Sequence, residues 1–307
     1  MNKKRILIQF YVSILSLMII SCNQIGEITT IPEAKSNFDL FAQYGEVHNA
    51  MLSYIDSNID ITTTCSTKED ALDYLVELQS RYAEELTLSD SDKKFIKELL
   101  PTYKHLYNKD NICLSKSTRS SSCNVEADTI YVYTTEDIYN SIEASFSRGE
   151  IDNFERQSLI NLITWCEENV TGNMTNETFE GKFNTLITQW ENHYSDTDFS
   201  SLIDEKGEFK NELKQVPAGA VSGVVLNISQ SSLEYWDMPE TKSVVATIVA
   251  QDIVGAVIGG VSGGVGSAII GGEWNWGSVA WGAGVGAITG STGVVGKVSK
   301  WIVRFIK

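Results

Sequence analysis

Residues 253–272 read IVGAVIGGVSGGVGSAIIGG, and residues 274–296 read WNWGSVAWGAGVGAITGSTGVVG. The two runs contain 20 and 23 residues without a formal charge. As α-helices they would be about 30 and 35 Å long, which is enough to cross the hydrocarbon core of a membrane. The sequence EWNWG at 273–277 is typical of a tight turn between them. The pattern therefore predicts a hydrophobic helical hairpin.

Small residues recur at every fourth position in both runs, and such spacing places them on one helix face, where a second backbone can approach closely. They are Gly255, Gly259, Gly263, Ser267 and Gly271 in the first run, and Gly282, Gly286 and Gly290 in the second. Each glycine costs a helix in water up to about 1 kcal/mol, so the face needs something packed against it. Two interpretations stay open: insertion into a membrane, or burial against the rest of the protein.

Aromatic and basic residues flank the apolar runs. Indole rings favour the membrane interface, and the flanking tryptophans are Trp274, Trp276, Trp281 and Trp301. Residues 297–307 are amphipathic, and their basic face consists of Lys297, Lys300, Arg304 and Lys307. This pattern indicates contact with an anionic membrane surface or lipopolysaccharide. The alternative is the polar end of a core helix.

The formal charge of -16 is unevenly distributed over the 307 residues. Residues 23–242 carry 17 basic and 38 acidic side chains, whereas residues 243–307 carry 4 basic and 2 acidic ones. A nucleic-acid partner is not expected, because a phosphate-binding face needs clustered Lys and Arg.

The acidic region 34–215 shows the apolar spacing of amphipathic helices. Helix starts are indicated at Thr67 and at Ser89, and only residues 129–134 alternate like a strand. An all-α fold is predicted, with a helical soluble domain followed by the glycine-rich hairpin. The apolar stripes are Ile138, Ile142 and Phe146; Leu159, Leu162, Ile163 and Cys166; and Phe179, Phe183, Leu186, Ile187 and Trp190.

No motif for catalysis or phosphate binding is found, and no cysteine–histidine spacing indicates a metal. We therefore expect neither an enzyme nor a cofactor. The predicted organisation is a signal peptide (1–21), a tether (22–33), an acidic helical domain (34–215), a linker (216–242) and a membrane-active hairpin with a basic tail (243–307).

The first 22 residues have a basic start, an apolar run and then Ser21-Cys22, which is the pattern of a signal peptide. The sequence IISC at 19–22 also resembles a bacterial lipobox. That resemblance implies cleavage before Cys22 and attachment of lipid to its thiol. The alternative is a plain secretory signal. Export to the outer membrane as a lipoprotein is expected, with exposure at the cell surface and release as open alternatives.

Four further cysteines in an exported chain favour disulfides. Cys113 and Cys123 flank a serine-rich loop and are predicted to pair, which leaves Cys65 with Cys166. Arg119 lies in this loop and is a candidate cleavage site for an activating protease. The alternative is an uncut loop with an incidental arginine.

The stretch DIVGAVIGG at 252–260, followed by the second glycine-rich run, resembles the glycine-zipper domains of class II bacteriocins. With Cys22, it is also similar to lipoproteins and secreted antibacterial toxins of the Bacteroidales, in which a helical body precedes such a hairpin. The resemblance implies an exported toxin that inserts its hairpin into the envelope of related bacteria, with membrane lipid or lipopolysaccharide as its partner. The alternative is an outer-membrane structural or interaction lipoprotein, anchored by lipid and hairpin.

Overall fold

The computed structural model describes residues 36–59, 68–103, 112–113, 133–236, 243–261 and 275–292. The predicted all-α class is confirmed for these residues, whose regular secondary structure is helical apart from one pair of two-residue strands and an isolated bridge between Ile203 and Phe209. The strands are β1 (Ile112–Cys113) and β2 (Tyr133–Thr134), and they pair in parallel. The end of the predicted strand 129–134 thus finds a partner.

The described part of the chain begins with the 3-10 helix η1 (Asp39–Phe41). The α-helices that follow are α2 (Ala42–Asn58), α3 (Lys68–Glu85), α4 (Asp90–Tyr103), α5 (Thr135–Ser147), α6 (Asn153–Val170), α7 (Asn176–His193), α8 (Ala220–Trp236), α9 (Ser243–Val261) and α11 (Trp276–Thr292). A second 3-10 helix, η4 (Ser200–Leu202), lies between α7 and α8.

The helices of the acidic region begin where local sequence satisfies their first amide groups. Thr134 and Asp152 each form a capping box with the residue three positions later, Asp137 and Glu155. Thr175 caps α7 by accepting a hydrogen bond from a backbone N–H. The predicted starts at Thr67 and Ser89 are confirmed by α3 and α4.

The predicted apolar stripes form the buried faces of α5, α6 and α7. Their buried members are Ile138 and Ile142; Leu159, Leu162, Ile163 and Cys166; and Phe179, Phe183, Leu186 and Trp190. The exceptions are Phe146, which is 37% exposed at the end of α5, and Ile187, which is partly buried in α7. Helical periodicity alone therefore identified most of this part of the core.

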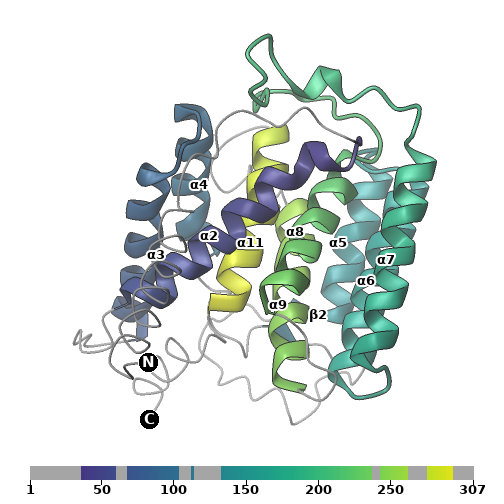
Figure 1. Ribbon diagram of the computed structural model, residues 1–307, viewed down its shortest axis with the longest axis horizontal. Helices are drawn as coiled ribbons and strands as arrows, with labels where there is room; N and C mark the ends of the chain where they lie inside the picture. Colours follow the sequence, from purple (N-terminus) through teal and green to yellow (C-terminus); the bar gives the residue numbers. More distant parts are fainter. Residues whose placement is uncertain are drawn as a thin grey trace, which may run out of the picture.

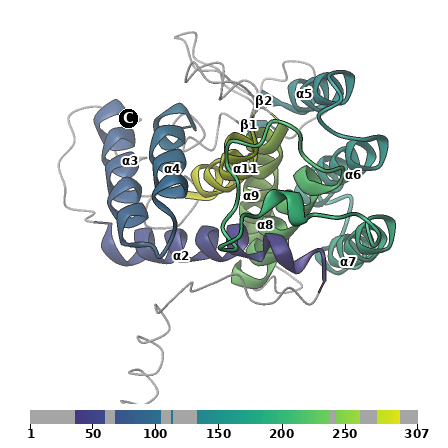
Figure 2. The same cartoon turned by 90° about the horizontal axis from the view of Figure 1, so that it is seen from above.

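Helices α8, α9 and α11 lie in the middle of the molecule (Figures 1 and 2). Helices α3 and α4 lie on one side of them, α5, α6 and α7 lie on the other, and α2 crosses the group. Every side chain of residues 248–261 and 276–290 is buried. Of the two interpretations of the glycine-rich runs, the described residues fit burial within the protein.

The segment 216–242 was predicted as a linker, but the structure instead contains helix α8 there. One face of α8 packs against α2 and another against α9. Its side chains from Ala220 to Ser229 are all buried. Small and apolar residues in this stretch fit between the acidic helices and the glycine-rich pair, which explains why a segment without charge periodicity forms a core helix.

Helix α9 begins ten residues before the charge-free run, at Ser243 rather than Ile253. Helix α11 begins at Trp276, after Asn275, whose side chain accepts a hydrogen bond from the N–H of Ser278 at 2.9 Å. Residues 262–274 lie outside the described residues, so the hairpin connection stays a prediction. Among the described helices, none is both long and apolar enough to span a membrane.

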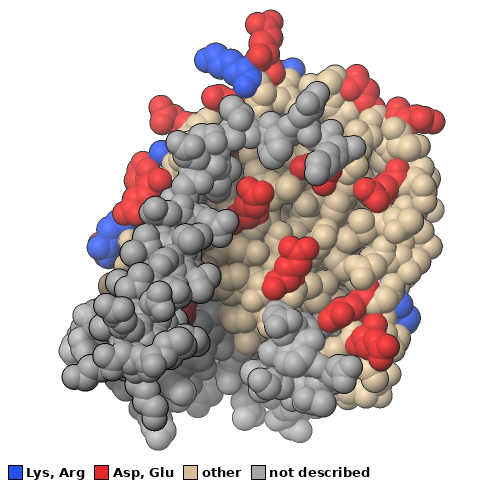
Figure 3. All heavy atoms as spheres, in the orientation of Figure 1, with Lys and Arg blue, Asp and Glu red and all other residues tan. Residues whose placement is uncertain are grey.

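Acidic side chains dominate the surface shown in Figure 3, where Asp and Glu are scattered over the face and Lys and Arg lie near its edges. The salt bridges among described residues are mostly between exposed partners, such as Arg81 with Glu77 and Lys97 with Glu84. Exposed pairs of this kind contribute little stability. The surface ion pairs therefore contribute little to the stability of the fold.

Candidate functional site

The predicted glycine face lies at the contact between α9 and α11. A Cβ atom added to Gly255 would fall on the carbonyl oxygen of Gly286, and one added to Gly259 would fall on that of Gly282. A Cβ at Gly290 would lie 2.6 Å from the backbone oxygen of Gln251. The two backbones therefore approach as closely as glycine allows, in the register that the four-residue spacing predicts. Gly263 and Gly271 lie outside the described residues.

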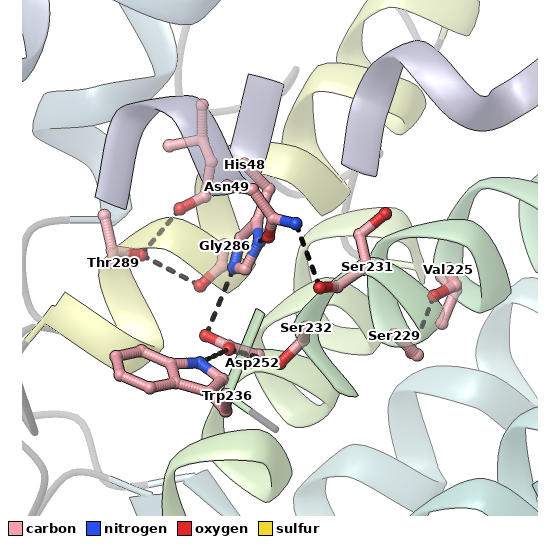
Figure 4. Close-up of polar contacts among 11 residues, drawn as sticks. His48, Asn49, Val225, Ser229, Ser231, Ser232, Trp236, Asp252, Gly286 and Thr289 are labelled. Atoms are coloured by element: carbon pink, nitrogen blue, oxygen red, sulfur yellow. Dashed lines mark hydrogen bonds and ion pairs between the residues drawn. The ribbon is translucent and has the colours of Figure 1, made fainter. Parts of the chain in front are cut away.

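Asp252 is the centre of a buried polar cluster that joins α9 to α8 and α2 (Figure 4). Its Oδ2 accepts hydrogen bonds from Ser232 Oγ at 2.5 Å and from Trp236 Nε1 at 3.0 Å. Its Oδ1 lies 3.3 Å from Nε2 of His48, and both side chains are 0% exposed. Figure 4 shows the imidazole and the carboxylate pointing toward one another.

The same cluster continues from α2 to α8. The Nδ1 atom of His48 lies 2.9 Å from Oδ1 of Asn49, whose amide nitrogen donates to the backbone oxygen of Ser231 at 3.0 Å. Gly45, one turn earlier, packs so closely that an added Cβ would lie 2.7 Å from Cβ of Ser231. Close backbone contact thus brings the imidazole within reach of α9.

Asp92 forms a second contact, between α4 and α11. Its Oδ1 accepts from Trp281 Nε1 at 2.6 Å and from Asn211 Nδ2 at 2.8 Å, while Ser89 Oγ donates to Oδ2 at 2.7 Å. The ring of Trp281 also packs edge-on against Tyr44, with ring centroids 4.9 Å apart. A carboxylate in the first turn of α4 therefore accepts a hydrogen bond from the glycine-rich helix α11.

Glu155 forms a third contact, between α6 and α8. Its Oε1 accepts from the backbone N–H of Ser222 at 3.1 Å and from the hydroxyl of the same residue at 3.2 Å. Burial raises the pKa of Glu155 to about 7, although backbone N–H groups of Ser222 and Asp152 act in the opposite direction. Ser222 also accepts from Trp190 Nε1 at 2.9 Å, so α7 joins the contact.

The predicted interface residues Trp276 and Trp281 are placed in the core rather than at a surface. They are 0% and 1% exposed. Trp276 packs among Phe41, Tyr44 and Phe209. Both rings have aromatic neighbours in the core, and the N–H of Trp281 has a buried carboxylate as its acceptor. The apolar and polar contacts that an indole finds at a membrane interface are thus available inside the protein. The other predicted interface residues lie outside the described residues: Trp274, Trp301, Lys297, Lys300, Arg304 and Lys307.

The structure has Cys166 as a free thiol buried in α6, and burial raises its pKa. Its predicted disulfide partner, Cys65, lies outside the described residues, as do Cys123, Arg119 and Cys22. Cys113 forms part of β1. The pairings and the cleavage site stay predictions.

The polar clusters hold helices together and are arranged differently from a catalytic triad. In a triad the histidine lies between the nucleophile and the acid, whereas here Asp252 lies between Ser232 and His48. All three side chains are fully buried. Among the described residues no group of three His, Cys, Asp or Glu side chains could hold a metal ion.

Sequence reasoning missed His48, Asp92 and Asp252 as contact residues. A signal existed for Asp252, which is the formal charge directly before the apolar run 253–272, but this position indicates a helix boundary when the helix is taken to begin at Ile253. Because α9 begins at Ser243, Asp252 instead lies near the middle of a buried helix. No pattern in the sequence pairs it with His48, which is 204 positions earlier.

Comparison with protein-family models, with curated proteins and with solved structures finds no match for this chain.

Proposed function

We propose that this protein is an exported, bacteriocin-like antibacterial toxin that carries a glycine-zipper helix pair in buried form and delivers it to the envelope of related bacteria. The observation that carries the proposal is the contact between α9 and α11 through Gly255, Gly259, Gly282 and Gly286. The hairpin of residues 243–307 is the acting segment, and the helical body is its carrier.

A glycine-to-glycine contact is suited both to the interior of a folded protein and to lipid. Its stability comes from van der Waals contact between backbones, which does not depend on surrounding water. A core that served the folded protein alone would be built more stably from Ala and Leu, since every glycine in a helix costs up to about 1 kcal/mol relative to Ala. The pair could therefore leave the body as a unit and keep its own contact in lipid.

The surrounding helices supply what a carrier requires. They cover the apolar side chains of α9 and α11 with amphipathic faces, and their outer surface is acidic. They also contact the pair through polar groups: Asp92 accepts a hydrogen bond from Trp281, and His48 lies 3.3 Å from Asp252.

The main test is growth inhibition of related bacteria that lack the gene, using the purified mature chain. We expect inhibition that disappears when residues 243–307 are deleted. A matched variant replaces Lys297, Lys300, Arg304 and Lys307 by Gln and leaves every described residue unchanged; it should lose binding to anionic vesicles. Absence of inhibition, together with firm retention in the producer's outer membrane, would favour the alternative of a doubly anchored lipoprotein.

Activation by proteolysis at Arg119 is a separable part of the proposal. Cleavage there would leave two chains held together if Cys113 and Cys123 are paired. Treatment with an Arg-specific protease should then give one band on a non-reducing gel and two on a reducing gel. A single band after reduction would remove this step and leave the rest of the proposal intact.

A further inference from the structure

We propose that the segment that enters the target membrane begins at α8 rather than at α9, so that α8, α9 and α11 leave the body as one three-helix unit. The inference deepens the proposed function and rests on it. It moves the start of the acting segment from Ser243 to Pro217 and assigns α8 a role in lipid.

Formal charge separates these three helices from the others. Helix α11 carries no charged side chain, and α8 and α9 carry one each, Glu234 and Asp252. Each of the other described α-helices carries at least two, and α2 has the fewest of these, Glu46 and Asp56. The charge-free run at α8 extends over 215–233 and contains 19 residues. Because charged side chains oppose entry into hydrocarbon, the acting segment is expected to begin before α8.

Helix α8 contacts α9 along one face. The residues of this face are spaced by four, seven and four positions, which places them on the same side of the helix: Val221, Val225, Ser232 and Trp236. At one end of the contact, a Cβ added to Gly260 of α9 would lie 3.3 Å from the side chain of Val225 and 3.7 Å from that of Val221. At the other end, Ser232 and Trp236 reach α9 by hydrogen bonds. The contact therefore runs along most of α8.

Asp252 depends on α8 for its hydrogen bonds. Both hydrogen bonds that the described residues donate to this carboxyl group come from α8, from the hydroxyl of Ser232 and the indole N–H of Trp236. In hydrocarbon no water replaces a lost donor, and hydrogen bonds between helices help to hold membrane bundles together. A carboxyl group needs such donors or acceptors there whether or not it carries a proton. If α9 and α11 entered lipid without α8, Asp252 would enter without these partners.

The contacts of α8 with α2 and η1 lie on a different face. Asn227 donates to the backbone oxygen of Phe38, and the backbone oxygen of Ser231 accepts from Asn49. These two positions are two and six residues after Val225, so they point away from the side that meets α9. Departure of the three helices together breaks these contacts and the one with α6, and it leaves the contact between α8 and α9 whole.

The chain changes in charge and in conformation directly before α8. The segment 204–214 contains seven charged side chains, and none follows until Glu234. Pro217 and Gly219 lie between the two parts, and Gly219 has a φ of 92°, a conformation that other residues rarely adopt. The boundary of the charge-free sequence and the start of α8 thus coincide.

The test is protection from proteinase K on phosphatidylglycerol vesicles at pH 7, with the full chain from residue 22. Cys22→Ser is included in every protein so that no lipid anchors the body. After digestion the vesicles are floated, and the fragments that they retain are identified by mass spectrometry. We expect retained fragments from 220–236 and 243–292, whereas fragments of α7 from 176–193 should stay in the supernatant.

Three other results would overturn the inference, and they differ in what they leave of the proposed function. Retention of 243–292 without 220–236 would mean that the helix pair enters alone, and the proposed function would stand. Retention of neither would refute the proposed function together with the inference. Retention of 176–193 with the three helices would mean that the body enters too, so that no unit begins at Pro217.

The double variant Ser232→Ala with Trp236→Phe measures the contribution of Asp252. It removes both donors to the carboxyl group and keeps an apolar face toward α9. Retention of 220–236 relative to 243–292 should therefore fall about tenfold, as expected for the loss of two hydrogen bonds between helices in a membrane. The result for the unmutated helices decides the inference by itself if this double variant does not fold.

The matched control is the double variant Ser231→Ala with Tyr235→Phe. It makes similar changes one position earlier, on the side of α8 that meets α2, where the hydroxyl of Tyr235 accepts from Ser53 at 3.3 Å. Retention of 220–236 in the control should equal that of the unmutated helices. Unchanged retention in the variant with Ser232→Ala, or an equal loss in both double variants, would overturn the inference.

Discussion

Helices α5, α6 and α7 bury one apolar stripe each and expose the opposite face to water, whereas α9 and α11 are buried on all sides along their described side chains. The first group begins at capping side chains such as Thr134 and Asp152, which belong to the same local sequence. The second group owes its contact to the absence of side chains at Gly255 and Gly259. The first group is thus stabilised by interactions between residues near in sequence, and the second by contacts between distant residues.

The difference also extends to polar groups. On the outside, acids pair with exposed bases, and these pairs contribute little stability. Around the central helices, Asp92, Glu155 and Asp252 are buried and accept hydrogen bonds from other helices. A change of protonation should therefore have little effect at the periphery and a large effect at the centre.

The largest effect is expected from Gly259→Ala. The added methyl group would collide with the backbone carbonyl of Gly282, which cannot move away without separating the helices. We expect a loss of about 3 kcal/mol in the free energy of unfolding, measured by urea denaturation. Gly284→Ala is the control, because its added Cβ would only meet the ring of Trp281 at 3.7 Å. It should be neutral or slightly stabilising, and equal losses in both variants would contradict the backbone contact.

Glu155 should make the fold less stable as the pH rises. Its pKa is raised to about 7 in the folded protein from an ordinary value of 4.5, so the folded state binds the proton more tightly than the unfolded state. Its stabilising contribution is complete below about pH 4.5 and is lost as the pH rises through 7, roughly 3 kcal/mol in total. Unfolding of the wild type and Glu155→Gln at pH 5 and pH 8 isolates this term. A constant difference between the two proteins would refute the assignment.

Trp281→Phe should have an intermediate effect. It keeps an aromatic ring against Tyr44 but removes the N–H that donates to Asp92, leaving Asn211 and Ser89 as the donors to that carboxylate. The expected loss is about 1.5 kcal/mol in thermal unfolding. Trp165→Phe, at a partly exposed position of α6 under Lys182, serves as the comparison and should change stability much less.

The smallest effect is expected at a peripheral cap. Thr134→Ala removes the side chain that accepts from the N–H of Asp137 and should cost about 1 kcal/mol or less. Hydrogen exchange should show the change in α5 and leave α9 and α11 protected. Faster exchange in all three helices would mean that the periphery and the centre are less independent than the comparison suggests.

The peripheral helices were predictable because their signals lie within a few residues of each other. The stripe from Phe179 to Trp190 and the cap at Ser89 need no information from the rest of the chain. Helix α8 was missed for the opposite reason. Its residues from Ala220 to Ser229 carry no charged face, so periodicity cannot separate a buried helix from an apolar linker.

The sequence by itself determined the helical class, the starts of α3 and α4, and the small-residue face of the glycine-rich runs. These features depend on helix caps and on four-residue spacing, which involve residues within one or two turns of each other. The tertiary structure alone decided that this face meets its partner inside the protein and that Asp252 faces His48. Such choices depend on which distant surfaces become buried together, and burial is a property of the whole fold. The charge-free runs raise the question of a membrane, and in the described residues α9 and α11 are packed inside the protein.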